Sequence, residues 1–440
     1  MLFEITLSLA LIAVFVFLIL KLRFFSTITH NRHILVLIFL LKMMAAVAGT
    51  VLYTHYYDPW TADMYKYFHG GRVLYSALPE SPSDYFSMVS GIGANSEHLH
   101  RYYDAADYWY KDFNYGLYND NRTMIRYNAL LCLLSQGKFY VNLVISVFVS
   151  FLGSILLLSA LLSVLKKHRL LLFLAVFLMP SVLFWSSGLL KEGLVIFTMG
   201  GLIWAAFRLK QKACAGSVLW LLVFAALLFL VKFYVLLALL PGLLFLILPH
   251  TASYVRQSLS MAAILLGMLL LFFGSNRLGG PNLPLIISQK QHDFVKYVKL
   301  AEGGSNVYLP AIEPNIGGFV KNMPRAYFHS FLRPHPLEIN SPLSLMAAAE
   351  NLFVLVLAIL AVIYFRKPQK HEFGIFLFSL SFVLILYALA GLSTPNLGAL
   401  VRYKMPALIF ALIAAGMCIN IHAFPRRIRK IALTITDEAK

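Results

Sequence analysis

Long runs of apolar residues recur along the chain, separated by short polar stretches. They cover roughly 2–20, 34–53, 139–164, 170–186, 193–207, 214–231, 233–249, 258–274, 344–364, 373–392 and 405–422. Most are long enough for a helix to cross about 30 Å of hydrocarbon. The pattern predicts an all-α polytopic integral membrane protein with about eleven transmembrane helices. We expect a single membrane domain over residues 1–440.

The charges between these runs predict an orientation. Short loops such as 166–169, 208–212 and 366–370 are basic, as cytoplasmic loops are. This places the N-terminus outside, the C-terminus in the cytoplasm and two long segments, 54–138 and 275–342, on the extracytoplasmic side. The first run has an acid near its start and basic residues behind it, the reverse of a signal peptide.

Composition narrows the function classes. The 440 residues are 60% hydrophobic and 13% charged, and the net charge of +18 is concentrated in membrane-flanking loops, which argues against a nucleic-acid partner. The three cysteines are far apart, and the histidines show no metal-binding spacing, so no metal or other cofactor is predicted. A divalent metal has no support, and no phosphate-binding P-loop occurs. Any substrate must therefore be activated already.

The two long segments differ in composition. The first holds nine of the chain's 19 acids and many tyrosines, and its stretches 102–118 and 124–134 predict amphipathic interfacial helices. The second contains three glycine-rich points, at 279–280, 303–304 and 317–318, which predict a mobile loop over a site.

Acidic and basic residues directly after the second apolar run form the first candidate group. Asp63 and Asp58 could act as a general base on a sugar hydroxyl, and His69 and Arg72 follow as possible substrate ligands. The alternative is that Asp58 or Asp63 caps an interfacial helix over 64–74.

A second group lies between two short apolar runs. Lys191 and Glu192 sit at a depth where charge is costly unless it is paired or used. Pro180 and Gly188 would break the helices and expose backbone N–H groups to an anion, with Lys191 binding a lipid-linked phosphate. The alternative is an ordinary helical hairpin whose lysine reaches the headgroups.

A third group precedes the last run. Arg402 can grip a phosphate with two hydrogen bonds and Lys404 adds charge, while Asn396 suits a tight turn near a ligand. The alternative is a loop of cations that meets lipid headgroups. Arg325 belongs to a further basic strip with His329, which lies on one helix face if that stretch is helical.

Three patches carry a resemblance. The early D-M-Y-x-Y stretch resembles the first external loop of GT-C-type glycosyltransferases. The segments M-P-S-V-L-F-W-S-S-G-L-L-K-E-G and P-N-L-G-A-L-V-R-Y-K-M-P are similar to O-antigen and exopolysaccharide polymerases. The resemblance implies sugar or glycan transfer from a polyprenyl-linked donor on the outer face of the bacterial inner membrane. By that analogy Asp63 is the catalytic aspartate, and Lys191, Arg402 and Arg325 hold the donor phosphates.

The expected partners are a polyprenyl-(di)phosphate-linked saccharide donor, a glycan or lipid acceptor, and membrane lipids. The aspartate that the resemblance implies to be catalytic follows the second apolar run rather than the first, which favours a polymerase over a single-sugar transferase. Two other classes stay open: a lipid-linked glycan flippase or transporter, and a non-catalytic envelope assembly subunit.

Overall fold

The computed structural model describes residues 2–26, 28–29, 31–56, 62–111, 118–248, 253–300 and 305–425, apart from the side chain at position 300. These residues are mostly helical, and pairing of extended backbone among them is limited to two isolated bridges, Asn306 with Asn396 and Phe365 with Ile419. Nine helices in these ranges are long and apolar enough to cross a membrane. The predicted all-α, multi-pass membrane class is confirmed.

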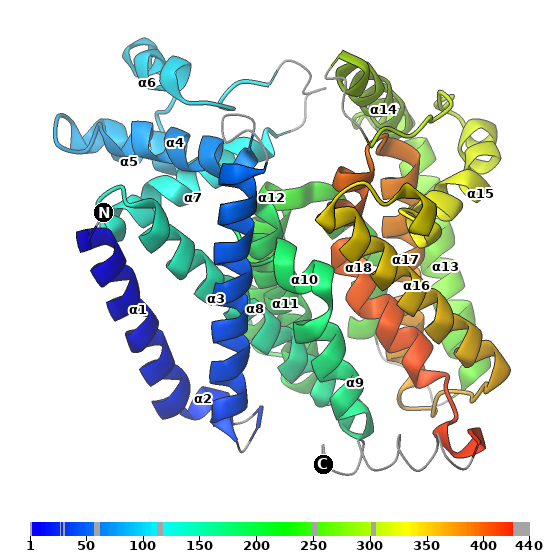
Figure 1. The fold of residues 1–440 in the computed structure, drawn as a ribbon. Coiled ribbons are helices and arrows are strands. Elements are labelled where there is room, and N and C mark those ends of the chain that lie inside the picture. The colour runs from blue at the N-terminus through cyan, green and yellow to red at the C-terminus, as the bar shows by residue number, and fades with distance from the viewer. Residues whose placement is uncertain are drawn as a thin grey trace. The chain divides into compact units, whose positions relative to one another are not determined.

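Figure 1 shows the order of the elements. The nine long apolar helices are α1 (Leu2–Lys21), α3 (Arg32–His55), α8 (Phe139–Leu162), α11 (Lys191–Gln211), α12 (Ala215–Ile247), α13 (Tyr254–Gly274), α16 (Pro342–Ile363), α17 (Phe373–Ser393) and α18 (Leu397–Met417). The other α-helices are α2 (Arg23–Ser26), α4 (Asp63–Tyr75), α5 (Pro82–Ser90), α6 (His100–Ala105), α7 (Asp120–Ser135), α9 (Arg169–Phe173), α10 (Pro180–Trp185), α14 (Leu283–Leu300) and α15 (Ile316–Leu332). Short 3₁₀ or π turns are η2 (Glu97–Leu99), η3 (Lys166–His168), η4 (Leu174–Leu178), η5 (Ser275–Leu278), η6 (Pro336–Glu338) and η7 (Ile421–Ala423).

Two of the predicted spans take a different form. The run 170–186 is divided into α9, the π turn η4 and α10, because Pro180 forces an extended backbone at Met179 (φ −66°, ψ 125°). The runs 214–231 and 233–249 join in α12, where Lys232 alone is non-helical (φ −154°, ψ 89°). The boundary that the sequence predicts between the two runs is therefore a break in the helix at Lys232, within α12.

The chain forms two compact units. The first unit contains Met1–Ser159, Leu183–Leu202 and Leu222–Phe233, and the second contains Ala160–Val182, Ile203–Leu221 and Tyr234–Lys440. Because α8, α11 and α12 run through both, this division leaves the prediction of a single membrane domain untested.

Aromatic side chains join the apolar helices of the first unit. Phe15 of α1 stacks on Phe148 of α8 with ring centroids 4.0 Å apart, and Phe39 of α3 meets both rings edge-on. The outer surface of α1 leaves Leu9 and Phe17 largely exposed. In water such an apolar surface would be costly, whereas hydrocarbon accepts it.

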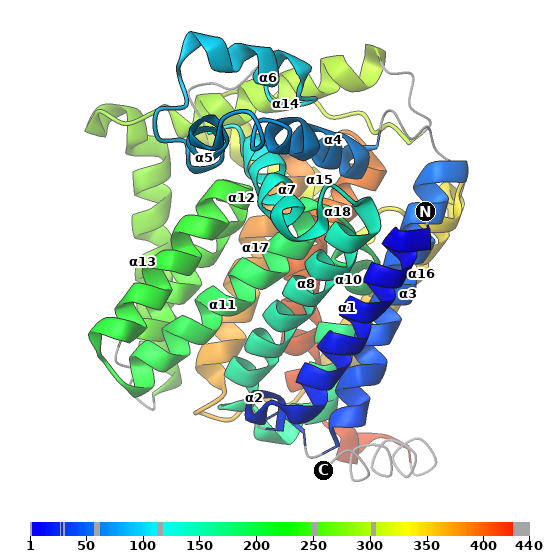
Figure 2. The same cartoon turned by 90° about the vertical axis from the view of Figure 1, so that its left-hand side faces the viewer.

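The segment 62–135 adds the helices α4 to α7 to the first unit. α4 packs along α7, and both views show α5 beside these two helices (Figures 1 and 2). The predicted helix over 124–134 is present as α7, and its interfacial position stays a prediction. The predicted helix over 102–118 is only partly present. α6 ends at Ala105, no helix follows between 106 and Lys111, and 112–117 lie outside the described residues.

The second unit is built around α17 and α18. Phe410 of α18 contacts the rings of Phe378 and Phe382 of α17, and α15 packs against α17. The segment 275–342 was predicted to be a mobile glycine-rich loop. Instead it forms α14 and α15, with Gly317 and Gly318 in the first turn of α15, while 303–304 lie outside the described residues.

Two glycines let α8 and α11 touch. A Cβ atom on Gly153 would overlap the backbone of Phe197, and one on Gly200 would overlap the carbonyl of Gly153. Small residues permit such close helix packing in membranes. Gly153→Ala should lower the free energy of unfolding by about 1–3 kcal/mol, because one backbone must move.

Thermal unfolding in detergent measures this effect. Gly267→Ala in α13 is the matched control, because a Cβ atom there has no neighbour within 4 Å. An equal melting temperature for wild type and Gly153→Ala would contradict the close packing.

Candidate functional site

The predicted site residues are divided between the units. Asp63, His69, Arg72, Lys191 and Glu192 belong to the first unit. Arg325, Arg402 and Lys404 belong to the second, and Asp58 lies outside the described residues.

Lys191 and Glu192 are the first two residues of α11. α10 ends at Trp185, and a turn through Gly188 leads into α11. Neighbouring residues on a helix point about 100° apart, so the two side chains leave the helix in different directions. Each of them finds a separate partner rather than pairing with the other.

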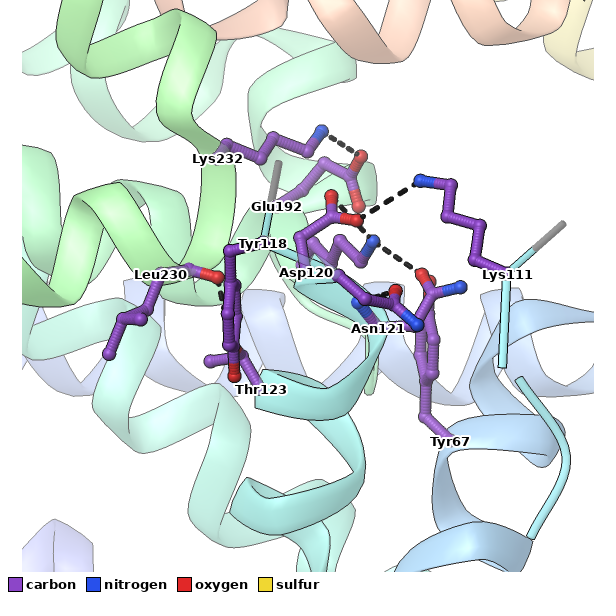
Figure 3. A network of polar contacts seen from close by, with 11 residues as sticks. Tyr67, Lys111, Tyr118, Asp120, Asn121, Thr123, Glu192, Leu230 and Lys232 are labelled. Carbon is purple, nitrogen blue, oxygen red and sulfur yellow. Dashed lines mark hydrogen bonds and ion pairs between the residues drawn. The ribbon is translucent and has the colours of Figure 1, made fainter. Parts of the chain in front are cut away.

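Lys191 pairs with the start of α7. Its Nζ lies 2.8 Å from Oδ2 of Asp120 and donates a hydrogen bond of 2.6 Å to Oδ1 of Asn121, and Figure 3 labels these two partners. The hydroxyl of Tyr67 in α4 donates to the same amide oxygen at 3.2 Å, and the Tyr67 ring lies 5.6 Å from the ammonium. The residue is only 8% exposed. This arrangement joins three separate helices around one ammonium.

Glu192 pairs with the break in α12. Its Oε1 lies 2.8 Å from Nζ of Lys232, and the two residues are 0% and 4% exposed. The non-helical backbone at Lys232 interrupts the helical hydrogen bonds there. Near the break the carbonyl of Leu230 accepts a 2.7 Å hydrogen bond from the Thr123 hydroxyl of α7. A side chain thus satisfies a backbone group beside the break.

The two ion pairs form one cluster, which we call the ion-pair centre: Lys111, Asp120, Asn121, Lys191, Glu192 and Lys232. Its acids and amide are in the first turns of α7 and α11, and Lys111 lies 3.4 Å from Oδ1 of Asp120. One end is buried at Glu192, whereas the Asp120 side chain is 28% exposed. Three lysines face two carboxylates, so the centre carries a net positive charge.

The charge of Asp120 is fixed by its neighbours. Burial alone would raise the pKa of this carboxyl, but the ammonium groups of Lys191 and Lys111 outweigh burial and hold its pKa well below the usual range. Asp120 therefore stays ionised throughout the physiological pH range. It is suited to accept a hydrogen bond rather than to hold a proton near neutral pH.

Lys191 retains capacity to bind an anion. An ammonium has three donors, and Asp120 and Asn121 take two of them. Within the part of the chain that the structure describes, the third has no hydrogen-bond acceptor. A phosphate oxygen could accept it without breaking either bond.

The acid predicted to be catalytic, Asp63, is the first residue of α4. Ala62 occupies the N-cap position, so Asp63 lies in the first turn, where a carboxylate favours the helix dipole. This agrees with the expected helix start. Asp63 is not among the partners of Lys191, which are Asp120, Asn121 and Tyr67.

The other two candidates of that group are exposed on α4. His69 lies 3.0 Å from the carboxylate of Asp107, and both side chains are about half exposed. Arg72 is also exposed. Their predicted substrate contacts stay predictions.

The last apolar helix begins earlier than expected. α18 starts at Leu397, and Asn396 caps it by accepting a hydrogen bond from the Ala399 N–H. Arg402 and Lys404 therefore lie inside the helix rather than in a loop before it. The expectation of a tight ligand-binding turn at Asn396 is wrong, because its side chain is used as a helix cap.

Lys404 has little capacity for a ligand. It is 3% exposed, and its Nζ donates to the carbonyls of Ser330 (2.8 Å) and Arg333 (3.0 Å) and to Oδ1 of Asn351 (2.8 Å). All three ammonium donors are thus used within the second unit. A structural role fits Lys404 better than phosphate binding.

The predicted helix that carries the basic strip is present as α15. Arg325 is exposed, with its guanidinium 6.0 Å from the ring of Tyr308, and stays a candidate anion ligand. His329 on the same helix is buried, and its ring accepts a hydrogen bond from Arg333 at 3.1 Å. Burial, together with the charges of Arg333 and Arg325, lowers the pKa of His329 to about 4.

This histidine should make stability depend on pH. Its pKa is about 6.5 in an unfolded chain and about 4 when folded. As pH falls from 6.5 to 4, the unfolded chain binds the proton first, so the free energy of unfolding should decrease by about 2–4 kcal/mol. His329→Gln should reduce this decrease. Melting temperatures at pH 7.5 and pH 4.5 measure it, and equal losses in wild type and variant would contradict the buried neutral ring.

The described residues contain no group of three or more histidine, cysteine, aspartate or glutamate side chains that could hold a metal ion. Sequence reasoning missed five members of the site: Tyr67, Lys111, Asp120, Asn121 and Lys232. The available signal was Lys232, the lone charge between two apolar runs.

No family model, curated protein or solved structure was found to match this chain.

Proposed function

We propose that the chain is a membrane-embedded glycosyltransferase or glycan polymerase. It moves a sugar or oligosaccharide from a polyprenyl-(di)phosphate donor on the extracytoplasmic face of the bacterial inner membrane. The observation that carries this proposal is the ion-pair centre. Ionisable groups within apolar spans are costly and usually serve function.

The centre offers complementary groups for such a transfer. Lys191, with its remaining donor, and Lys111 would bind the donor's diphosphate and stabilise the charge that develops as it leaves. Ionised Asp120 would accept a hydrogen bond from the attacking hydroxyl of the acceptor. The hydroxyl oxygen forms a bond to the anomeric carbon as the carbon–phosphate oxygen bond breaks. The hydroxyl proton is released to solvent as the new bond forms, while Asp120 keeps its negative charge.

The finer topology belongs to the same proposal. Eleven crossings result if 170–186 crosses as a broken helix and α12 crosses twice, changing direction at Lys232. The N-terminus is then outside, the C-terminus cytoplasmic, and the segments 54–138 and 275–342 external. Asp63 as a base, and Arg325 and Arg402 as phosphate ligands, stay predictions from the resemblance.

Reconstitution of the purified protein in liposomes tests the proposed transfer reaction. Purified protein in liposomes should convert an undecaprenyl-diphosphate-linked oligosaccharide into a longer glycan and release undecaprenyl diphosphate. Wild-type protein that is folded and supplied with donor and acceptor, yet releases none, would contradict the proposal.

One observation favours a second candidate, a lipid-linked glycan flippase. A helix broken at a buried Lys232–Glu192 pair resembles the discontinuous helices of transporters. In the same liposomes a flippase would move the labelled donor between leaflets without changing its glycan length.

A further inference from the structure

A cavity in the second unit is not used by the proposed function. It has a volume of about 560 Å³ and lies where α11 and α12 end and α13 and α17 begin. Lining residues from these helices are Phe207, Leu246, Gln257 and Ile375. All belong to the second unit. The size is within the range of small-molecule sites, about 300–1,000 Å³.

The rim of this cavity is basic. Lys210, Lys370 and His371 line it and are exposed, and no lining residue in the described chain is acidic. The adjoining carboxylate of Glu372 is 1% exposed, lies 3.4 Å from His168 and accepts a hydrogen bond from the Gln369 N–H. The Glu372 carboxylate thus already has partners within the protein, His168 and the Gln369 N–H. The rim therefore favours an anion.

The wall of the cavity is apolar. Val164, Phe207, Leu246 and Ile375 contribute hydrocarbon surface, and Gln257 is a buried polar group among them. A free phosphate would satisfy the lysines but leave this wall without a partner. An anionic head attached to a hydrocarbon chain matches both parts.

Within the second unit, the cavity lies at a helix end that suits a lipid headgroup. α17 begins at Phe373 beside the cavity, whereas its other end, at Ser393, is near the cap of α18. The basic stretches 208–212, at the end of α11, and 366–370 adjoin the cavity. Lysines at such a boundary attract anionic lipids, by about 1 kcal/mol each.

We propose that this cavity is a binding site for an anionic phospholipid, with the headgroup phosphate between Lys210 and Lys370 and the start of an acyl chain against Phe207 and Ile375. The cavity shares no residue with the ion-pair centre, and its occupancy does not depend on the proposed transfer reaction.

The test uses purified full-length protein and native mass spectrometry. Protein from nanodiscs of equal phosphatidylglycerol and phosphatidylcholine should retain phosphatidylglycerol selectively. The double variant Lys210→Gln/Lys370→Gln should bind phosphatidylglycerol about 30-fold more weakly. The matched control is Lys166→Gln/Lys167→Gln, two exposed lysines that do not line the cavity. It should bind as wild type does.

Two further arms complete the test. Ser163→Trp places an indole at the cavity lining and should displace the lipid while leaving the lysines in place. Inorganic phosphate at 10 mM should not compete. Unselective lipid retention, wild-type retention by the double variant, or displacement by inorganic phosphate would each overturn the proposal.

Discussion

Glu192→Gln is expected to lower the free energy of unfolding by about 3–5 kcal/mol, the usual effect of removing one partner of a buried pair. Lys232 is 4% exposed and its ammonium lies 2.8 Å from the glutamate oxygen. An amide cannot compensate a buried charge. Denaturant or thermal unfolding in detergent measures the loss.

A double variant shows whether the loss of stability comes from breaking the ion pair or from any substitution at position 192. Glu192→Leu/Lys232→Met replaces both charges by apolar groups of similar size and should regain most of the lost stability. Glu97→Gln removes an exposed acid and should change stability little. If the double variant is less stable than Glu192→Gln, the two charges do not act as a pair.

Asp120→Asn is expected to lower glycan transfer by at least about 100-fold in the reconstituted assay, because the neutral amide accepts a weaker hydrogen bond from the attacking hydroxyl and cannot carry the negative charge. The variant keeps the size of the side chain and one acceptor oxygen for Lys191. Asp120 is partly exposed, so protein yield and melting temperature should fall less than for Glu192→Gln. Asp104→Asn, an exposed acid in the same segment, is the control.

The same assay distinguishes the two candidate aspartates. Asp63 lies in the first turn of α4, and Asp120 contacts the lysine that retains an unused donor. Asp63→Asn should therefore reduce transfer less than Asp120→Asn. A larger loss for Asp63→Asn would restore the aspartate that the resemblance indicates.

The sequence predicts the membrane class well because the hydrocarbon core sets both the length of an apolar run and the length of the helix that crosses it. Seven of the predicted runs, such as 2–20 and 344–364, match a single helix closely. The sequence predicts the first residue of a helix poorly where polar residues lie within a membrane span. Arg402 and Lys404 indicated a loop, but the cap at Asn396 and burial of Lys404 against carbonyl oxygens allow α18 to begin before them.

Two of the six residues of the ion-pair centre were predictable for a similar reason. Lys191 and Glu192 are conspicuous because charge is rare near an apolar run. Their partners are not, since Asp120 is one of many acids in its segment and lies about seventy positions from Lys191 in sequence. Only the fold of α7 against the start of α11 brings the two together.

Binding of undecaprenyl diphosphate to purified protein tests the central claim, that Lys191 beside Asp120 holds an anionic lipid carrier. Lys191→Met should weaken binding and abolish transfer. Asp120→Asn should bind at least as tightly as wild type, because it removes the competing negative charge, yet fail to transfer. Wild-type binding by Lys191→Met would contradict the account.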